Sequence, residues 1–266
     1  MSYAYAANLY EKLKGTEEDN TELKSKLATS YLNINNYPKA IEYYAQIVEL
    51  PEATADDFYN YAYALKVNGN YTESDRWMQK FATAKPTDSR AKLFVANQDY
   101  RAKIDNAKQY YALKKSDLST SHVDFGGYLN PAQDQVYVIS SRRRNPMVEH
   151  EWTWDGRRFL DIYVTPYNAD GKVGKVKKMK KVNTKFHEGP LAFSKDGKTV
   201  YFTRNNIAQG NKRRDKDKIQ NLKIYIADVD AKGRFVNERE FKYNSQDYSV
   251  GHPAITADGK TMFLVS

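Results

Sequence analysis

The chain has 266 residues, which is enough for one or two domains with a sizeable core. Charged residues make up 28% and hydrophobic residues 41%, a balance typical of globular rather than disordered proteins. The absence of cysteine excludes disulfides, cysteine–zinc sites and thiol nucleophiles. The sequence has no apolar run near the roughly 18 residues of a membrane span, and its start lacks the pattern of an intact signal peptide. The protein is therefore either cytoplasmic or a chain whose targeting segment is gone.

The net charge of +9 is unevenly distributed. Residues 1–115 hold 16 basic and 15 acidic side chains, and residues 116–266 hold 26 and 18. The excess concentrates in Arg142–Arg144, Lys172–Lys181 and Lys212–Lys218. A shift of this kind indicates a domain boundary near residue 115. The basic stretches are either solvated loops or contacts with an anionic surface.

Residues 1–115 repeat with a period of 34. Ala28, Ala62 and Ala96 are spaced by this interval, and turn formers such as Asn68-Gly69-Asn70 interrupt helical patterns between them. Small residues at such positions let paired helices approach closely. The period and the order of small, aromatic and proline residues resemble the tetratricopeptide repeat, with two full repeats (21–54 and 55–88) and a degenerate third. We therefore expect an α-solenoid over residues 1–115.

The concave face of such a solenoid is lined by the first helix of each repeat. On this alignment the residues that point to it are Ser25, Thr29, Tyr59, Tyr63, Leu93 and Asn97. They are predicted to hold a peptide or helix of a partner, although Tyr59 and Tyr63 would also suit local packing. Ser25 and Thr29 stand where some tetratricopeptide domains place Lys and Asn to bind C-terminal carboxylates, so chaperone-tail binding is not expected.

From residue 116 the pattern changes to short alternating strands. The predicted strands are Gln135–Ser140, Phe159–Pro166, Thr199–Arg204, Leu222–Val229, Phe235–Tyr243 and Thr261–Val265. Between them lie the turn dipeptides Asp170-Gly171, Asp196-Gly197, Lys232-Gly233 and Asp258-Gly259, in which glycine accepts the positive φ of a tight turn.

This half also contains an internal repeat. Residues 189–203 line up with residues 251–265 through a shared Asp-Gly-Lys triplet, and residues 126–141 are a weaker copy. Repeated β units of this kind are typical of propeller blades. We therefore expect residues 116–266 to form the first blades of an all-β propeller that is incomplete in this chain.

The β motif, a proline and apolar residue followed by Ser/Thr-x-Asp-Gly-Lys and an apolar–aromatic pair, resembles the TolB-type, WD40-like blade. The order of helical repeats, then KFHEGPLAFSKDGKTVYFTRNN, then QDYSVGHPAITADGKTMFLVS resembles Bacteroidetes OmpA-family proteins. This resemblance implies a lipoprotein on the periplasmic face of the outer membrane. It also implies envelope-protein partners, as in the type IX secretion and gliding machinery, and a C-terminal peptidoglycan-binding domain. The chain shows neither an N-terminal lipidation cysteine nor that domain, so we expect the natural protein to continue.

Catalytic chemistry is not indicated. The four histidines show no metal-ligand spacing, and His187 and His252, which precede strands, are expected to be structural. The sequence contains no nucleophile elbow or phosphate loop, so we expect no enzyme activity, cofactor or metal.

The favoured hypothesis is a non-enzymatic scaffold that binds envelope proteins. The alternative is a binder of anionic glycan, lipid or nucleic acid. It would act through basic loops at Arg142, Arg143, Arg144, Lys212, Arg213 and Arg214. Nucleic acid is not the expected partner, because no recognised nucleic-acid fold accompanies these residues.

Overall fold

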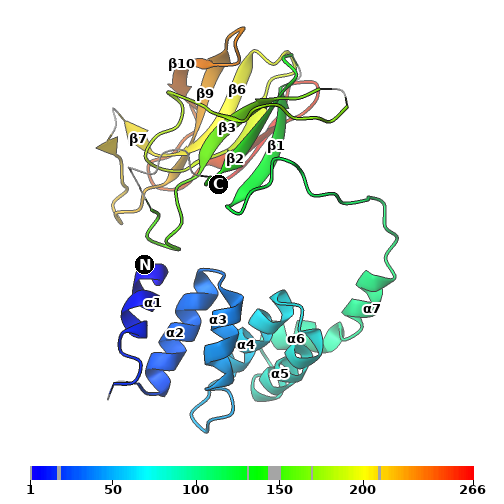
Figure 1. Ribbon diagram of the computed structural model, residues 1–266, viewed down its shortest axis with the longest axis vertical. Helices are drawn as coiled ribbons and strands as arrows, with labels where there is room; N and C mark the ends of the chain where they lie inside the picture. Colours follow the sequence, from blue (N-terminus) through cyan, green and yellow to red (C-terminus); the bar gives the residue numbers. More distant parts are fainter. Residues whose placement is uncertain (1, 17–18, 131, 143–150, 169, 209–210) are drawn as a thin grey trace. The chain divides into compact units, whose positions relative to one another are not determined.

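The structure is a computed structural model that describes residues 2–16, 19–130, 132–142, 151–168, 170–208 and 211–266. The chain divides into two compact units (Figure 1). The helical unit comprises Met1–Leu113 and Trp152–Arg157, and the β unit comprises Lys114–Glu151 and Arg158–Ser266.

The helical unit stacks its helices in chain order (Figure 1). They are α1 (Tyr3–Glu11), α2 (Thr21–Asn33), α3 (Tyr37–Ala45), α4 (Ala55–Val67), α5 (Tyr71–Ala84), α6 (Ser89–Ala96) and α7 (Tyr100–Asp105). Helix α4 starts 34 residues after α2 (55 − 21), and α5 starts 34 residues after α3 (71 − 37). The predicted 34-residue repeat of helix pairs is therefore confirmed for these two pairs.

The helix boundaries follow from local capping. Asn20 caps α2 by accepting a hydrogen bond from the Leu23 amide, and Thr54 and Asp57 form a reciprocal capping box at the start of α4. Gly69 adopts a positive φ of 87° in the turn between α4 and α5. These signals fix where each helix begins and where the chain reverses.

The core of the helical unit combines small and large side chains. The predicted small residues Ala28, Ala40 and Ala62 are fully buried, and aromatic rings such as Tyr44 and Trp77 fill the space beside them. The last repeat departs from the pattern: α6 has eight residues and α7 begins at Tyr100, five residues before the position that the period gives. This matches the expected degenerate third repeat.

The β unit contains antiparallel strands throughout. They are β1 (Asp124–Asn130), β2 (Gln135–Ser140), β3 (Asp161–Pro166), β4 (Lys177–Lys178), β5 (Glu188–Phe193), β6 (Thr199–Asn205), β7 (Ile207–Ala208), β8 (Asn211–Lys212), β9 (Leu222–Val229), β10 (Phe235–Glu240), β11 (Gly251–Ile255) and β12 (Met262–Val265). They form one sheet of order β1-β2-β3-β4, one of order β10-β9-β6-β5, and the two-stranded sheets β11-β12 and β7-β8.

The predicted propeller is wrong. The described strands make open sheets of four and two strands, and these sheets close into neither a ring of blades nor a barrel. The two four-stranded sheets instead share one hydrophobic core, in which Tyr137 and Ile162 of the first sheet meet Phe202 and Tyr225 of the second. The physical reason is that a repeated hairpin motif specifies each sheet separately, whereas closure depends on how many sheets surround an axis.

The internal β repeat itself is present in the structure. The hairpins β1-β2, β5-β6 and β11-β12 each carry a register shift at the same place, between Phe125 and Tyr128, between Glu188 and Leu191, and between Gly251 and Ala254. The glycines of the four predicted turn dipeptides all have positive φ, as expected. The three hairpins are thus structural equivalents.

Candidate functional site

A cavity of about 450 Å³ lies among the last helices of the helical unit. We call it the α4–α7 groove. Its lining residues are Tyr59, Ala62, Tyr63, Lys66, Ser74, Asp75, Met78, Arg90, Leu93, Phe94, Asn97 and Tyr100. Helices α4, α5, α6 and α7 therefore all contribute to it, because stacked helix pairs leave a hollow on the side where their first helices lie.

The structure brings together four of the six predicted groove residues. Tyr59, Tyr63, Leu93 and Asn97 line the α4–α7 groove. The other two, Ser25 and Thr29, line a separate hollow of about 390 Å³ beside α1. The prediction of one surface that includes all six is therefore corrected to two hollows, of which the α4–α7 groove is the larger.

The groove offers apolar surface to solvent. Tyr63 is 43% exposed and Leu93 is 67% exposed, although both are large hydrophobic side chains on well-formed helices. Beneath them Ala62 is buried, and the buried Ser74 hydroxyl donates to the Ala62 carbonyl. The floor is thus a satisfied helix contact, while the rim carries apolar groups that a partner can cover.

Charged groups lie at the rim of the groove. The Lys66 ammonium lies 3.9 Å from the centre of the Tyr100 ring, and the Tyr100 hydroxyl donates to Asp75 at 3.3 Å. Burial and the Asp75 carboxylate raise the pKa of Tyr100, so this hydroxyl remains protonated. Within the described residues no carboxylate is paired with Lys66, so the cation is available to an anionic group.

Arg90 is already paired. Its guanidinium binds Asp88 at 2.9 Å and Asp56 at 3.0 Å, and its carbon lies 4.2 Å from the centre of the Tyr59 ring. Tyr59 also contacts Phe81 at 5.2 Å between ring centres. Tyr59 therefore fits the local-packing alternative, whereas Tyr63 and Leu93 keep free surface.

Sequence reasoning missed the polar groups of this groove. Lys66 follows Tyr63 by three residues on α4, and Arg90 precedes Leu93 by three residues on α6. Positions three apart share a helix face, so extending the predicted face by one turn would have found both. Asp75 and Tyr100 belong to other helices and carry no such signal.

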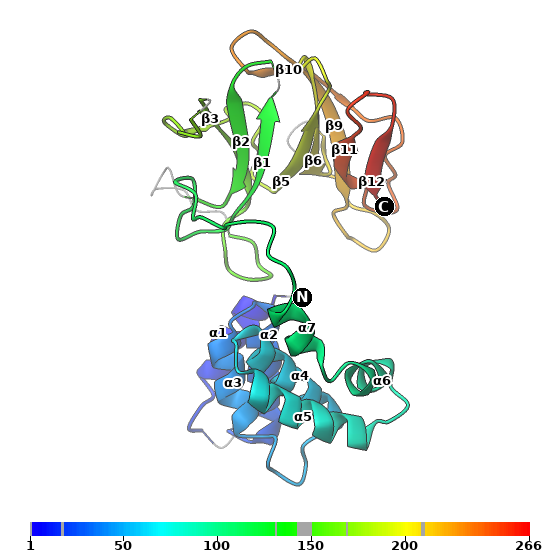
Figure 2. The same cartoon turned by 90° about the vertical axis from the view of Figure 1, so that its right-hand side faces the viewer.

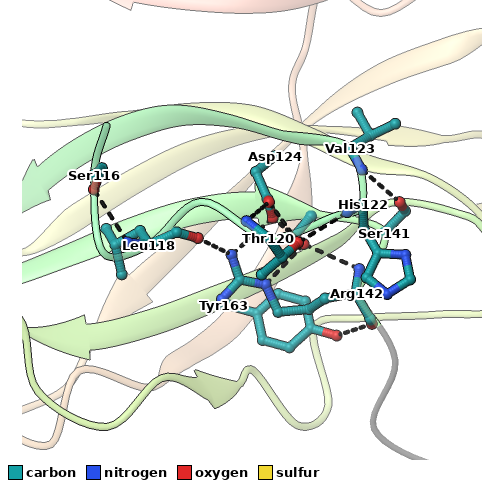
Figure 3. A network of polar contacts seen from close by, with 10 residues as sticks. Ser116, Leu118, Thr120, His122, Val123, Asp124, Ser141, Arg142 and Tyr163 are labelled. Carbon is teal, nitrogen blue, oxygen red and sulfur yellow. Dashed lines mark hydrogen bonds and ion pairs between the residues drawn. The ribbon is translucent and has the colours of Figure 1, made fainter. Parts of the chain in front are cut away.

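Arg142, predicted to contact anions from a loop, is instead part of a polar network at the end of β2 (Figure 3). Its guanidinium donates to Asp124 and to the Leu118 carbonyl, both at 2.7 Å, and its side chain is 13% exposed. Tyr163 donates to the Arg142 carbonyl at 2.9 Å. The prediction is corrected: Asp124, 18 residues earlier in the sequence, neutralises this cation.

The remaining basic residues are placed only in part. Arg143 and Arg144 lie outside the described residues, and Lys212 lies in β8. Arg213 and Arg214 are exposed, and Arg213 is 3.8 Å from Glu240. The described residues therefore do not assemble the six arginines and lysines into one anion-binding surface.

The predicted structural histidines have local contacts. The Leu160 amide donates to Nδ1 of His187 at 3.2 Å, and the His252 amide donates to Thr203 at 2.9 Å. Across the described ranges, acidic and histidine side chains do not converge into a group that could hold a metal ion. In the same ranges, the helices lack the length and apolar character needed to cross a membrane.

Comparisons with known proteins do not identify a family. No protein-family model matches the chain, and no curated protein matches it. Among solved structures, it is similar to the tetratricopeptide-containing C-terminal domain of a protein described as FK506-binding from Plasmodium falciparum. The two are 20% identical, the match covers 38% of this chain and 80% of that domain, and the TM-score is 0.32.

Proposed function

We propose that the protein is a binding scaffold whose helical unit holds a segment of a partner protein in the α4–α7 groove. The observation that carries this proposal is the exposure of Tyr63 and Leu93 around a hollow of about 450 Å³. A stable fold gains nothing from leaving such surface in water, whereas a partner segment that covers it gains apolar burial.

The groove also favours a particular kind of segment. Apolar side chains of the partner would cover Tyr63 and Leu93, and an acidic side chain would lie near Lys66 at the rim. The paired Arg90 would contribute mainly as a flat wall beside Tyr59. An amphipathic segment with an acidic end satisfies these conditions better than a uniformly charged one.

A photo-crosslinking residue in place of Tyr63 tests the proposal in living cells. The crosslinker should capture a discrete partner, and adding Leu93→Asp should remove that product because it puts a charge on the apolar rim. The matched control carries the crosslinker at Tyr5, an exposed α1 residue outside the groove. Identical products from positions 63 and 5 would exclude the groove as a binding site.

We further propose, from the sequence resemblance alone, that the partner is an envelope protein of a secretion or motility complex. The protein itself would then lie at the periplasmic face of the outer membrane, and any peptidoglycan contact would come from a further domain. Cell fractionation followed by pull-down should recover outer-membrane components. Recovery of cytoplasmic proteins alone would refute this location without affecting the groove.

A further inference from the structure

The three equivalent hairpins of the β unit differ in what lies beside their second strand. In the first sheet β2 pairs with β3, and in the second sheet β6 pairs with β9. The equivalent strand β12 pairs with β11 alone among the described residues, and Figure 2 shows its other edge without a neighbour. This open edge of β12 is a candidate binding site in the β unit, separate from the proposed function.

Burial marks the same difference at the side chains. The equivalents of Phe263, Leu264 and Val265 in β2 are Tyr137, Val138 and Ile139, all of which are at most 3% exposed. Phe263 is 64% exposed and Val265 is 63% exposed. Four successive apolar residues, Met262–Val265, thus stand at an edge whose counterparts are covered.

The backbone hydrogen bonds show which groups wait at the edge. The Thr256 amide donates to the Thr261 carbonyl, so Thr261 and Phe263 turn their amide groups to β11. Alternation along an antiparallel strand then turns the N–H and C=O of Leu264 to the open edge. In the complete sheets the equivalent residues Val138 and Phe202 lie opposite Tyr163 and Tyr225.

The two complete sheets also give the sequence of the covering strand. Opposite β2 stands Ile162-Tyr163-Val164, and opposite β6 stands Ile224-Tyr225-Ile226. We propose that the open edge of β12 binds one extended antiparallel strand with the pattern apolar–Tyr–apolar, whose tyrosine pairs with Leu264. The described residues do not supply this strand, because β3 and β9 are already paired within their own sheets.

A fluorescent peptide with the sequence of residues 222–229 is the probe, added to the 266-residue chain. Anisotropy should report saturable binding, and the Leu264 amide should become protected from hydrogen exchange. Leu264→Pro removes the edge N–H but no hydrogen bond to β11, and should weaken binding about tenfold or more. Leu264→Ala keeps the N–H and is the matched control, expected to bind within a few-fold of the parent.

A peptide with Asn in place of its tyrosine should bind more weakly than the parent peptide, because the ring is buried in both complete sheets. Equal binding by the Leu264→Pro and Leu264→Ala chains would overturn the proposal, as would an unprotected Leu264 amide in the parent chain. Self-association that Leu264→Pro abolishes would also overturn it, since β12 would then pair with a second copy. Circular dichroism verifies that each variant keeps its sheet content.

Discussion

Asp124 and Glu188 occupy the same position in two repeated hairpins, opposite Ser140 and Arg204, yet their carboxyl groups behave in opposite ways. Burial raises the pKa of both. At Asp124, hydrogen bonds from Ser140, Thr120 and Arg142 outweigh burial and lower the pKa to about 2. At Glu188, Thr184 donates to one oxygen while the buried second oxygen has no hydrogen-bond partner, and burial raises the pKa to about 8.

The low pKa of Asp124 predicts an acid-sensitive β unit. The folded carboxyl titrates near 2 and the unfolded one near 3.8, so its stabilisation is present above pH 3.8 and is lost as the pH falls to 2. Asp124→Asn should lower the free energy of unfolding by about 2 kcal/mol at pH 7. Denaturant unfolding at pH 7 and pH 2 measures this, and a difference that persists unchanged at pH 2 would contradict it.

The high pKa of Glu188 predicts the opposite dependence. The folded state keeps a proton that the unfolded state releases, so stability falls as the pH rises from 4.5 to about 8. The loss is about 1.4 kcal/mol for each pH unit in this window. Glu188→Gln should remove this slope and stabilise the protein at pH 8, as measured by urea unfolding. The exposed Glu52→Gln controls for the loss of one negative charge, and an unchanged slope in Glu188→Gln would rule out the assignment.

At the scale of elements, the turns of β5-β6 and β11-β12 form a matched pair. Gly197 and Gly259 both have positive φ, 67° and 72°, in the same Asp-Gly-Lys turn. A Cβ atom on Gly197 would lie 2.2 Å from the Asn130 side-chain oxygen, whereas one on Gly259 would meet nothing within 4 Å. The first turn docks on β1, and the second is free.

Both Gly197→Ala and Gly259→Ala should therefore destabilise the β unit through the left-handed backbone, by about 1–2 kcal/mol. Gly197→Ala should cost clearly more, because Asn130 must move and lose its hydrogen bond to the Gly197 carbonyl. Thermal melts followed by circular dichroism measure the difference. Equal losses in the two variants would show that the contact with Asn130 contributes nothing.

The elements that the sequence predicts well are those with local signals. The 34-residue spacing of Ala28 and Ala62 predicted the helix pairs, and the Asp-Gly turns predicted the hairpins. The assembly of the sheets was not predictable in the same way, because the shared core depends on contacts between residues such as Tyr137 and Phe235 that lie far apart in sequence. Arg142 was misread for the same reason, since a run of three arginines resembles a loop until Asp124 is found opposite.

At the scale of the whole molecule, residues from the second half of the sequence complete the helical unit. The Trp154 indole donates to the Asn33 carbonyl at the end of α2, and the Ala4 amide in α1 donates to the Trp154 carbonyl, both at 3.1 Å. The Trp154 ring also meets Tyr3 edge to face at 4.8 Å between centres. These bonds satisfy one helix end of each kind, which helices otherwise leave open.

A fragment of residues 1–113 should therefore melt lower than the helical transition of the full chain, by about 5–10 °C. Trp154→Ala in the full chain should reproduce most of that loss, because it removes the indole N–H and the ring contact. Circular dichroism at a helical wavelength follows both melts. Thr153→Val, an exposed change in the same segment, should leave the transition in place. If the fragment and the Trp154→Ala chain melted with the parent, the helical unit would be independent of residues 152–157.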